Sequence, residues 1–316
     1  MSVGVVGLGL IGGSLLRALG GAGYDADPAT RAAAAADGFE VADEIAGLAG
    51  CELVLVAVPP ARTAAVVELA LDALPDALVA DTASVKAPLP RHERLVGAHP
   101  MAGAETAGWA ASTPVLLQGA TWAACPAGEA LEPLLALSAA VDALGGRIVP
   151  CTPDEHDAAV AHTSHVPHLA AQALAGLAAE GGLQAALAGT AFRDMTRVAR
   201  SDAELWTEIL ALNRDACLLA LDELVARLGV LRGALGDDAA LGTEWALGQG
   251  WLETVDAARW RDPEWRGARR RLARAARARP RGPRRAALAA RRGRRLARGG
   301  GAVTRPPRNQ QAKGPR

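Results

Sequence analysis

The sequence predicts an α/β domain with a mainly parallel sheet, followed by an all-α domain. Short apolar runs alternate with helical segments up to residue 152, which is typical of a parallel sheet covered by helices. A glycine-rich turn directly follows the first apolar run and opens a helix, as in Rossmann-type domains. After Pro153 no strand pattern remains. We therefore expect a Rossmann-like domain at 1–152 and a helical domain at 153–258.

The elements of the first domain follow in order along the chain. Helices are expected at 11–19, 29–36 and 61–74. Strands are expected at 3–6, 52–60, in runs that end near Asp81 and His99, and at 121–126 and 146–151. Only the residues GGAGY lie between the first helix and Asp25, so a second strand there must be short.

An apolar stripe marks the second domain. Its members recur at spacings of four and three residues, which predicts one amphipathic helix with Leu205, Ile209, Leu212, Ala216 and Leu219 on one face. Small helical domains often bury such stripes against a second subunit, so we expect a homodimer.

Composition and charge argue against a zinc-binding protein, a protein with a signal peptide and a membrane-spanning protein. Residues 1–258 carry 13 Lys+Arg against 32 Asp+Glu, which indicates an acidic body. The four cysteines form no CxxC pair, so we expect reduced thiols in the cytoplasm and no metal site. The apolar N-terminus has no preceding basic region, which argues against a signal peptide, and no other run is long enough to span a membrane.

The last part of the chain has a different composition. Residues 259–316 carry 21 Lys+Arg against 2 Asp+Glu. We expect a disordered tail or a segment outside the selected reading frame. An arm that binds nucleic acid is the weaker alternative.

The turn from Gly7 to Gly12 has the GxGxxG spacing of a dinucleotide-binding loop. Gly7 permits the tight turn, Gly9 allows a pyrophosphate to approach the backbone, and Gly12 allows the helix to pack against the strand. Leu10 and Ile11 complete the loop, and the helix that starts here presents free N–H groups to phosphate.

Asp25 in GYDADP is the candidate ligand of the ribose hydroxyls. A carboxylate at this position accepts hydrogen bonds from the 2′-OH and repels a 2′-phosphate, so we expect NAD to be preferred over NADP. The structural alternative is an Asx turn, because Asp25 and Asp27 precede Pro28.

Ligands of such sheets bind outside the carboxyl ends of the strands. Val58 and Pro59 lie at the end of one strand and are expected to contact the cofactor. Ser84 and His99 follow two others and are expected beside the nicotinamide, where a neutral imidazole accepts a proton and a serine hydroxyl orients the substrate. Lys86 would bind a carboxylate or orient its loop, and a packed histidine is the structural alternative for His99.

Two further clusters carry polar side chains. The segment HDAAVAHTSHVPH holds His156, His162, His165 and His168, which suit the lining of a cleft better than a zinc site because Pro167 interrupts the register. The segment FRDMTRVARSD holds Arg193, Asp194 and Arg197, and an arginine in a cleft binds a carboxylate through two hydrogen bonds. A charged surface helix is the alternative there.

Together these motifs resemble the prephenate/arogenate dehydrogenase family of tyrosine biosynthesis. The resemblance runs in order over about residues 1–235, through GLGLIGGSL, GYDADP, VAVPP, DTASVK, GAHPMAGAETAGW, HDAAVAHTSHVPH and FRDMTRVARSDAELWTEILALN. It implies oxidative decarboxylation of prephenate, with hydride transfer to NAD⁺ and release of CO₂.

The resemblance also implies roles for residues. His99 takes the proton of the substrate 4-hydroxyl and Ser84 binds that hydroxyl. Arg197 binds a substrate carboxylate, and His165 and His168 line the cleft, the latter toward the pyruvyl side chain. Ion-pair positions near the site are implied for Glu105 and Asp194.

Several alternatives stay open on the sequence. Arogenate differs from prephenate by an amino in place of a keto group, and no residue separates the two. A catalytically impaired homologue that only binds nucleotide is a further alternative, because the short second strand would move Asp25 and weaken the adenosine pocket. His99, Ser84 and SHVPH argue against a hydroxyacid or pyrroline-carboxylate reductase. The residues after 235 are too few and too Arg-rich for a regulatory ACT domain, so we expect no tyrosine regulation through one.

Overall fold

The computed structural model describes residues 1–104, 106–126, 131–179 and 181–258. Its first compact unit is Met1–Trp265, and the described residues all belong to it. The Arg-rich tail at 259–316 and Glu105 lie outside the described residues.

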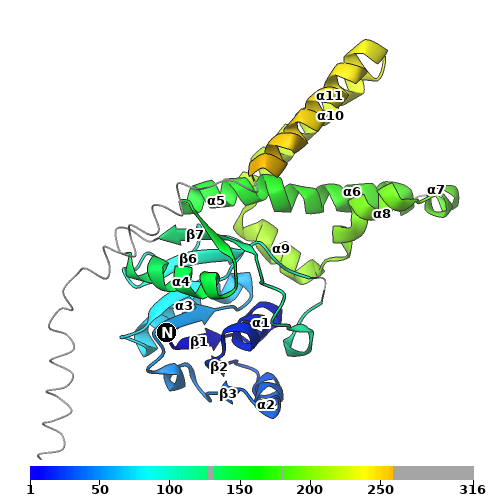
Figure 1. Ribbon diagram of the computed structural model, residues 1–316. Helices are drawn as coiled ribbons and strands as arrows, with labels where there is room; N and C mark the ends of the chain where they lie inside the picture. Colours follow the sequence, from blue (N-terminus) through cyan, green and yellow to red (C-terminus); the bar gives the residue numbers. More distant parts are fainter. Residues whose placement is uncertain (105, 127–130, 180, 259–316) are drawn as a thin grey trace, which may run out of the picture. The chain divides into compact units, whose positions relative to one another are not determined.

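The first half of the chain builds one sheet of eight strands in the order β3-β2-β1-β4-β5-β6-β7-β8 (Figure 1). All neighbouring strands are parallel except β6 and β7, which are antiparallel. This confirms the predicted α/β class and the mainly parallel sheet. The strands are β1 (Val3–Val6), β2 (Ala22–Tyr24), β3 (Glu40–Val41), β4 (Leu53–Val56), β5 (Leu78–Asp81), β6 (Leu95–Pro100), β7 (Thr121–Pro126) and β8 (Arg147–Pro150).

Helices bury both faces of this sheet. One apolar core joins the sheet to α1 (Leu10–Leu19) and α4 (Glu132–Ala143). A second core joins it to α3 (Pro60–Ala73) and the short turn η1 (Ile45–Leu48). The strands therefore have apolar residues on both faces, which explains why they appear as continuous apolar runs. The remaining helical elements here are α2 (Pro28–Ala36) and η2 (Trp109–Ala111).

A two-residue turn accommodates the short second strand. Gly20 and Gly21 join α1 to β2 with φ of 70° and 102°, a region that favours glycine. A Cβ atom at Gly21 would lie 2.0 Å from the carbonyl oxygen of Val3, so a side chain has no room there. All three residues of β2 pair with β1, and the predicted displacement of Asp25 is wrong because this turn keeps the strand in register.

The second half of the described chain is helical. Its elements are α5 (Pro153–Val160), the π-helical turn η3 (Ala161–His165), α6 (Val166–Ala179), α7 (Gly182–Ala186), α8 (Thr190–Thr196), η4 (Arg197–Arg200), α9 (Ala203–Leu212), α10 (Arg214–Ala234) and α11 (Asp238–Ala258). None of the helices within the described ranges is both long and apolar enough to cross a membrane.

The predicted apolar stripe does not lie on one helix. The helix is interrupted at Asn213, which lies between α9 and α10. The backbone of Asn213 is not helical, with φ of −113° and ψ of 32°. The side-chain amide of Asn213 donates to the carbonyl oxygen of Asp157 at 2.8 Å, and this tertiary contact stabilises the interruption between the two helices. Leu205 and Leu219 consequently belong to different helices, and only Ile209 of the five stripe residues is fully buried.

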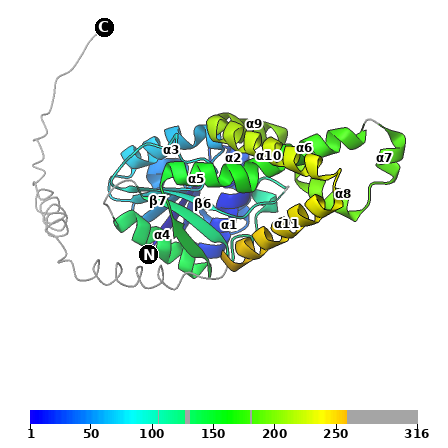
Figure 2. The same cartoon turned by 90° about the horizontal axis from the view of Figure 1, so that it is seen from above.

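Packing within the helical half places α9 near the sheet domain. A small core joins η3 and α6 to α10 through Ala161, Val166, Cys217 and Ala220. Helix α9 lies beside α3, as Figure 2 shows, and Glu208 accepts a hydrogen bond from the backbone N–H of Ala61 at 3.3 Å. The helical half thus faces the carboxyl ends of the strands.

Candidate active site

In the glycine turn between β1 and α1, a side chain would have space at Gly9 but not at Gly7 or Gly12. Gly7 has φ of 89°, and a Cβ on it would lie 2.5 Å from the carbonyl oxygen of Ala57. A Cβ on Gly12 would lie 1.8 Å from the carbonyl oxygen of Gly7. A Cβ on Gly9 would meet nothing within 4 Å. The backbone is therefore open at Gly9, on the side that a phosphate can approach.

The first turn of α1 is free to bind an anion. Gly9 is the N-cap and makes no side-chain capping bond, and no acidic residue occupies the first turn, which begins with Leu10 and Ile11. The carboxylate of Asp25 accepts a hydrogen bond from the backbone N–H of Leu8 at 2.6 Å. Asp25 therefore lies directly against the glycine turn, at the end of β2. Its other oxygen accepts from the N–H of Asp27 at 2.8 Å, so the expected Asx turn forms as well.

The segments that follow β4, β5 and β6 reach the same edge of the sheet. Val58 and Pro59 follow β4 next to the glycine turn, where the N–H of Ala57 donates to the carbonyl oxygen of Val6 at 2.7 Å. Strands β5 and β6 are parallel, with Ala80 opposite Val96. Ala80 and Val96 are the last paired residues of these two strands. Ser84 lies four residues after Ala80 and His99 three residues after Val96, so both lie beyond the paired part of the two strands.

The side chain of Lys86 is bound inside the protein. Its side chain has no solvent-exposed surface and forms an ion pair with Asp81, which is equally buried. The ammonium also donates to the carbonyl oxygen of Ala98 at 2.6 Å. Because these partners occupy the ammonium group, of the two predicted roles the geometry favours the one that orients the loop.

His99, His156 and Asp157 form a connected relay. The Nδ1 atom of His99 lies 2.9 Å from Nε2 of His156. The Nδ1 atom of His156 lies 2.7 Å from a carboxylate oxygen of Asp157. The carboxylate also accepts from the backbone N–H groups of Lys86 and Ala87, each at 2.8 Å.

The relay determines which nitrogen of each ring carries a proton. The Asp157 carboxylate only accepts, so Nδ1 of His156 carries a proton, and in a neutral ring Nε2 is then an acceptor. His99 must then donate from Nδ1, which leaves its Nε2 with a free lone pair. The chain of contacts thus sets His99 as a base through Nε2.

Electrostatics keep this base neutral. Burial, followed by the positive charge of Lys86 and by the nearby rings of His156 and His165, holds the pKa of His99 well below its usual value of 6.5. Burial alone would raise the pKa of Asp157, but hydrogen bonds from His156 and the backbone lower it. At neutral pH the relay therefore contains a carboxylate and a neutral terminal imidazole.

His165 occupies the interior of the helical half. It ends the π-helical turn and is 1% exposed. Its Nδ1 lies 3.2 Å from the amide nitrogen of Asn213 and 3.4 Å from the sulfur of Cys217. Burial lowers its pKa to about 4. The π-helical turn directs the ring toward α10, and a role of His165 in the cleft stays a prediction.

His168 lies one turn further along α6 and is only partly buried. Its ring stacks on Trp206 of α9 with centroids 3.4 Å apart, and its Nδ1 donates to the carbonyl oxygen of Ser164 at 2.8 Å. Burial lowers its pKa, and the positive charge of Arg197 adds to this effect. Arg197 therefore lies near His168, whereas Asp194 is exposed on α8.

The four clustered histidines have separate partners. His156 faces His99, His165 faces Asn213, His168 faces Trp206, and the exposed His162 faces Glu223 at 2.8 Å. Among the residues that the structure describes, no group of three or more His, Cys, Asp or Glu side chains is arranged to hold a metal ion.

Comparison with known proteins relates both halves to one family. The model described as "Prephenate dehydrogenase, nucleotide-binding domain" matches residues 16–150, and that described as "Prephenate dehydrogenase, dimerization domain" matches 152–240. A cyclohexadienyl dehydrogenase of Zymomonas mobilis is 34% identical over 261 residues, covering 74% of this chain and 88% of the relative. The chain belongs to the prephenate dehydrogenase family.

Two further similar proteins are named prephenate dehydrogenase as well. A prephenate dehydrogenase of Bacillus subtilis is 30% identical over 256 residues, covering 72% of this chain and 68% of the relative. The crystal structure of prephenate dehydrogenase from A. aeolicus in complex with hydroxyphenyl propionate and NAD⁺ superimposes with a TM-score of 0.71 at 25% identity. That superposition covers 81% of this chain and 98% of the other.

Sequence reasoning missed three residues of the site in this prephenate dehydrogenase family member. By sequence His156 belongs to the cluster of four histidines, and the motifs assign no role to Asp157 or Trp206. The available signal was local: Thr152 and Glu155 form a capping box, which places the next two residues in the first turns of α5. Nothing in the sequence shows that a side chain of this turn reaches His99 of β6.

Proposed function

We propose that this chain is an NAD-dependent prephenate dehydrogenase that converts prephenate to 4-hydroxyphenylpyruvate by oxidative decarboxylation. The observation that carries the proposal is the relay from Asp157 through His156, which leaves Nε2 of His99 as a neutral proton acceptor. The names of the relatives support the same reaction class.

The residues of the glycine turn fit a dinucleotide. Gly9 offers open backbone, Gly7 and Gly12 have no room for a side chain, and the N–H groups at the start of α1 are uncapped. Asp25 would bind the adenosine ribose, and its charge favours NAD over NADP. Val58 and Pro59 would contact the cofactor beside this turn. Bound NAD⁺ supplies the hydride acceptor.

The chain's own residues then have distinct tasks. Nε2 of His99 accepts the proton of the substrate hydroxyl, and Ser84 holds that hydroxyl in line. Arg197 binds a carboxylate of the substrate, and His168, held by its stack on Trp206, lines the side-chain end. Loss of CO₂ makes the ring aromatic, so the protein needs only to orient the ring and to accept one proton.

Arogenate is the second candidate substrate. The Zymomonas mobilis relative carries the broader name cyclohexadienyl dehydrogenase, which denotes the ring and not its side chain. The ring end of the proposed site, with His99 and Ser84, suits either compound. Discrimination between prephenate and arogenate would depend on His168 and Arg197, which are proposed to bind the side-chain end of the substrate.

We also infer that the protein is a homodimer built through its helical half. Helices α10 and α11 expose large apolar side chains: Trp245 is 69% exposed, Trp251 51% and Leu219 67%. Exposed apolar surface of this extent is typical of a subunit interface. Sedimentation of the full-length chain tests the inference, because a monomer at micromolar concentration would contradict it.

One assay tests the proposed activity. We would follow NADH formation with prephenate and arogenate, each with NAD⁺ and with NADP⁺, on the wild type and on His99→Asn. We expect turnover with NAD⁺ that falls by about 10²–10⁴-fold in the variant. Absence of turnover with both substrates contradicts the proposed function, and undiminished turnover in His99→Asn contradicts the role of His99.

A further inference from the structure

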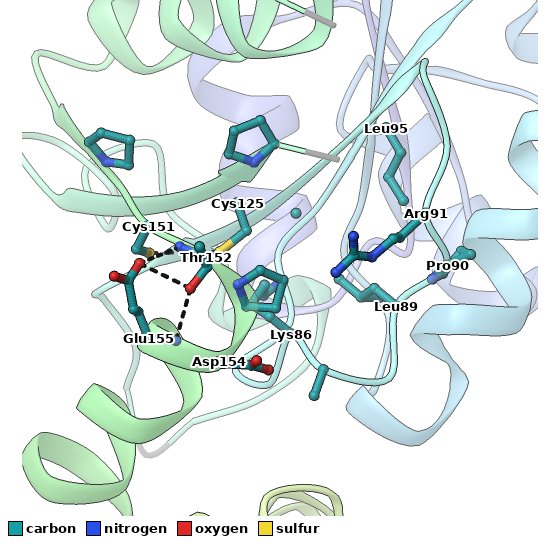
Figure 3. A pocket seen from close by; sticks show the side chains of 15 residues that line it. Lys86, Leu89, Pro90, Arg91, Leu95, Cys125, Cys151, Thr152, Asp154 and Glu155 are labelled. Atoms are coloured by element: carbon teal, nitrogen blue, oxygen red, sulfur yellow. Dashed lines mark hydrogen bonds between the residues drawn. The ribbon is translucent and has the colours of Figure 1, made fainter. Parts of the chain in front are cut away.

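Two cysteines lie side by side outside the proposed site. Cys125 is on β7, Cys151 directly follows β8, and their sulfur atoms are 3.7 Å apart. Both line a pocket of about 610 Å³ that also includes Arg91, Thr152 and Glu155 (Figure 3). We propose that Cys125 and Cys151 are a modification site that forms a reversible disulfide in response to a hydroperoxide.

The backbone geometry suits a disulfide. Ala124 pairs with Pro150 in the parallel β7–β8 ladder, and the N–H of Cys151 donates to the carbonyl oxygen of Ala124 at 3.0 Å. The two cysteines therefore follow a paired position on adjacent strands. A disulfide needs a sulfur separation of about 2.0 Å, so the sulfurs have only a short distance to close.

The other two cysteines lack this arrangement. The sulfur of Cys217 lies 3.4 Å from Nδ1 of His165, and the sulfur of Cys51 would lie 3.2 Å from a Cβ added to Gly4. Burial raises the pKa of both thiols, which disfavours the reactive thiolate. The chain therefore has one thiol pair and two isolated thiols.

The environment distinguishes the roles of the paired cysteines. Cys125 is buried, whereas Cys151 is partly exposed to the pocket. The hydrogen bond between the two sulfurs lowers the pKa of Cys151, and the same bond together with burial raises the pKa of Cys125. Cys151 also directly precedes the N-terminal cap of α5, where the helix dipole favours negative charge, although Glu155 opposes this. Cys151 is therefore the attacking thiolate.

The chemistry balances with hydrogen peroxide as the oxidant. The Cys151 thiolate attacks one peroxide oxygen, the O–O bond breaks, and hydroxide leaves, which forms a sulfenic acid. The Cys125 sulfur then attacks the Cys151 sulfur, the S–O bond breaks, and the released hydroxide takes the Cys125 proton as water. The two thiols lose two electrons to the peroxide, and an external thiol reverses the step by exchange.

The new bond would join the strand beside His99 to the segment that leads into α5, the helix of His156. Cys151 lies next to Thr152, the cap of the helix that carries His156, while Cys125 pairs with Gly97, two residues before His99 on β6. Closing the sulfur gap draws the start of α5 toward β7 and misaligns His156 and His99. This consequence rests on the proposed function, and we expect turnover to fall by about 10–100-fold.

Peptide mapping of the full-length wild type decides the chemistry without any assay of activity. The reduced protein is treated with hydrogen peroxide, free thiols are alkylated, and a tryptic digest is analysed without reduction. Trypsin cuts after Arg147, between the two cysteines, so a Cys125–Cys151 disulfide appears as two linked peptides. We expect this link, its loss with dithiothreitol, and alkylated Cys51 and Cys217. Alkylation of all four cysteines, or irreversible oxidation of Cys151 beside an alkylated Cys125, would overturn the proposal.

Three variants test the order of events. In Cys125→Ser, dimedone should trap a sulfenic acid on Cys151, and in Cys151→Ser, Cys125 should stay unmodified. Cys51→Ser is the matched control and should still form the disulfide. Labelling of Cys125 in Cys151→Ser would overturn the assignment of the attacking thiol. Circular dichroism checks folding, and if a variant does not fold, the wild-type map remains decisive.

Turnover is then compared before and after peroxide. A fall in the wild type that dithiothreitol reverses, and that is absent in Cys151→Ser, supports the coupling to the relay. A mapped disulfide with unchanged turnover overturns the coupling. If the reduced protein has no turnover at all, the proposed function fails while the mapped disulfide still stands.

Discussion

The Nδ1 atom of His99 lies 2.9 Å from Nε2 of His156, and this contact joins a strand of the sheet to a helix of the second half of the chain. The two residues are 57 positions apart in the sequence. Because His156 is itself held by Asp157, the contact sets the tautomer of His99 as well as its orientation.

Replacing His156 should reduce turnover without weakening cofactor binding. His156→Phe removes the acceptor for His99 Nδ1, so we expect kcat to fall on the order of 100-fold while KM for NAD⁺ stays near the wild-type value. His156→Gln keeps an acceptor at the position of Nε2 and should recover part of the loss. Steady-state kinetics of both variants provide the measurement. Equal loss in the two variants would show that the ring serves only to fill space.

The pH dependence of turnover should reflect the lowered pKa of His99. Protonation removes the lone pair at Nε2, so activity is present above the pKa of His99 and is lost as the pH falls through it. Since burial holds that pKa well below 6.5, we expect kcat to persist below pH 6.5 and to decline only in more acidic buffer. Profiles of kcat against pH, with circular dichroism at each pH, test this. A decline centred at or above 6.5 in folded protein would contradict it.

The glycine turn offers a matched pair of substitutions. Gly9→Ala places a methyl group in open space, so the fold should be retained while KM for NAD⁺ rises, because the methyl group lies where phosphate would approach. Gly12→Ala places its methyl group 1.8 Å from the carbonyl oxygen of Gly7 and should lower the free energy of unfolding. Thermal melting and cofactor titration separate the two effects. Normal affinity of Gly9→Ala for NAD⁺ would show that the glycine turn does not bind the cofactor.

Lys86 should matter for stability more than for substrate binding. Lys86→Met leaves the buried Asp81 carboxylate without its cation, which we expect to lower the free energy of unfolding by about 3–5 kcal/mol. Arg91→Met, a change of similar shape at an exposed position, should alter it by less than about 0.5 kcal/mol. Urea denaturation measures both. A Lys86→Met protein of normal stability with a raised KM for prephenate would restore the role in substrate binding.

Local patterns in the sequence determined the α/β class, most strands and the glycine turn. Each of these depends on residues close together in the chain: apolar runs for buried strands, and glycines where a side chain has no room. The same logic placed Ser84 and His99 at the ends of adjacent parallel strands, since strand ends share one edge of a sheet. Whether Asp25 selects NAD, and how Arg197 meets a substrate, stay predictions.

Tertiary structure alone decided the rest. The break at Asn213, the inward turn of His165 and the burial of Lys86 each depend on partners distant in the chain, namely the Asp157 carbonyl, Asn213 and the Ala98 carbonyl. The relay is the clearest case. His156 and Asp157 have an ordinary helical sequence around them. They gain their role only because tertiary packing brings His156 against His99 of β6, where burial and a single hydrogen bond make one nitrogen of His99 a base.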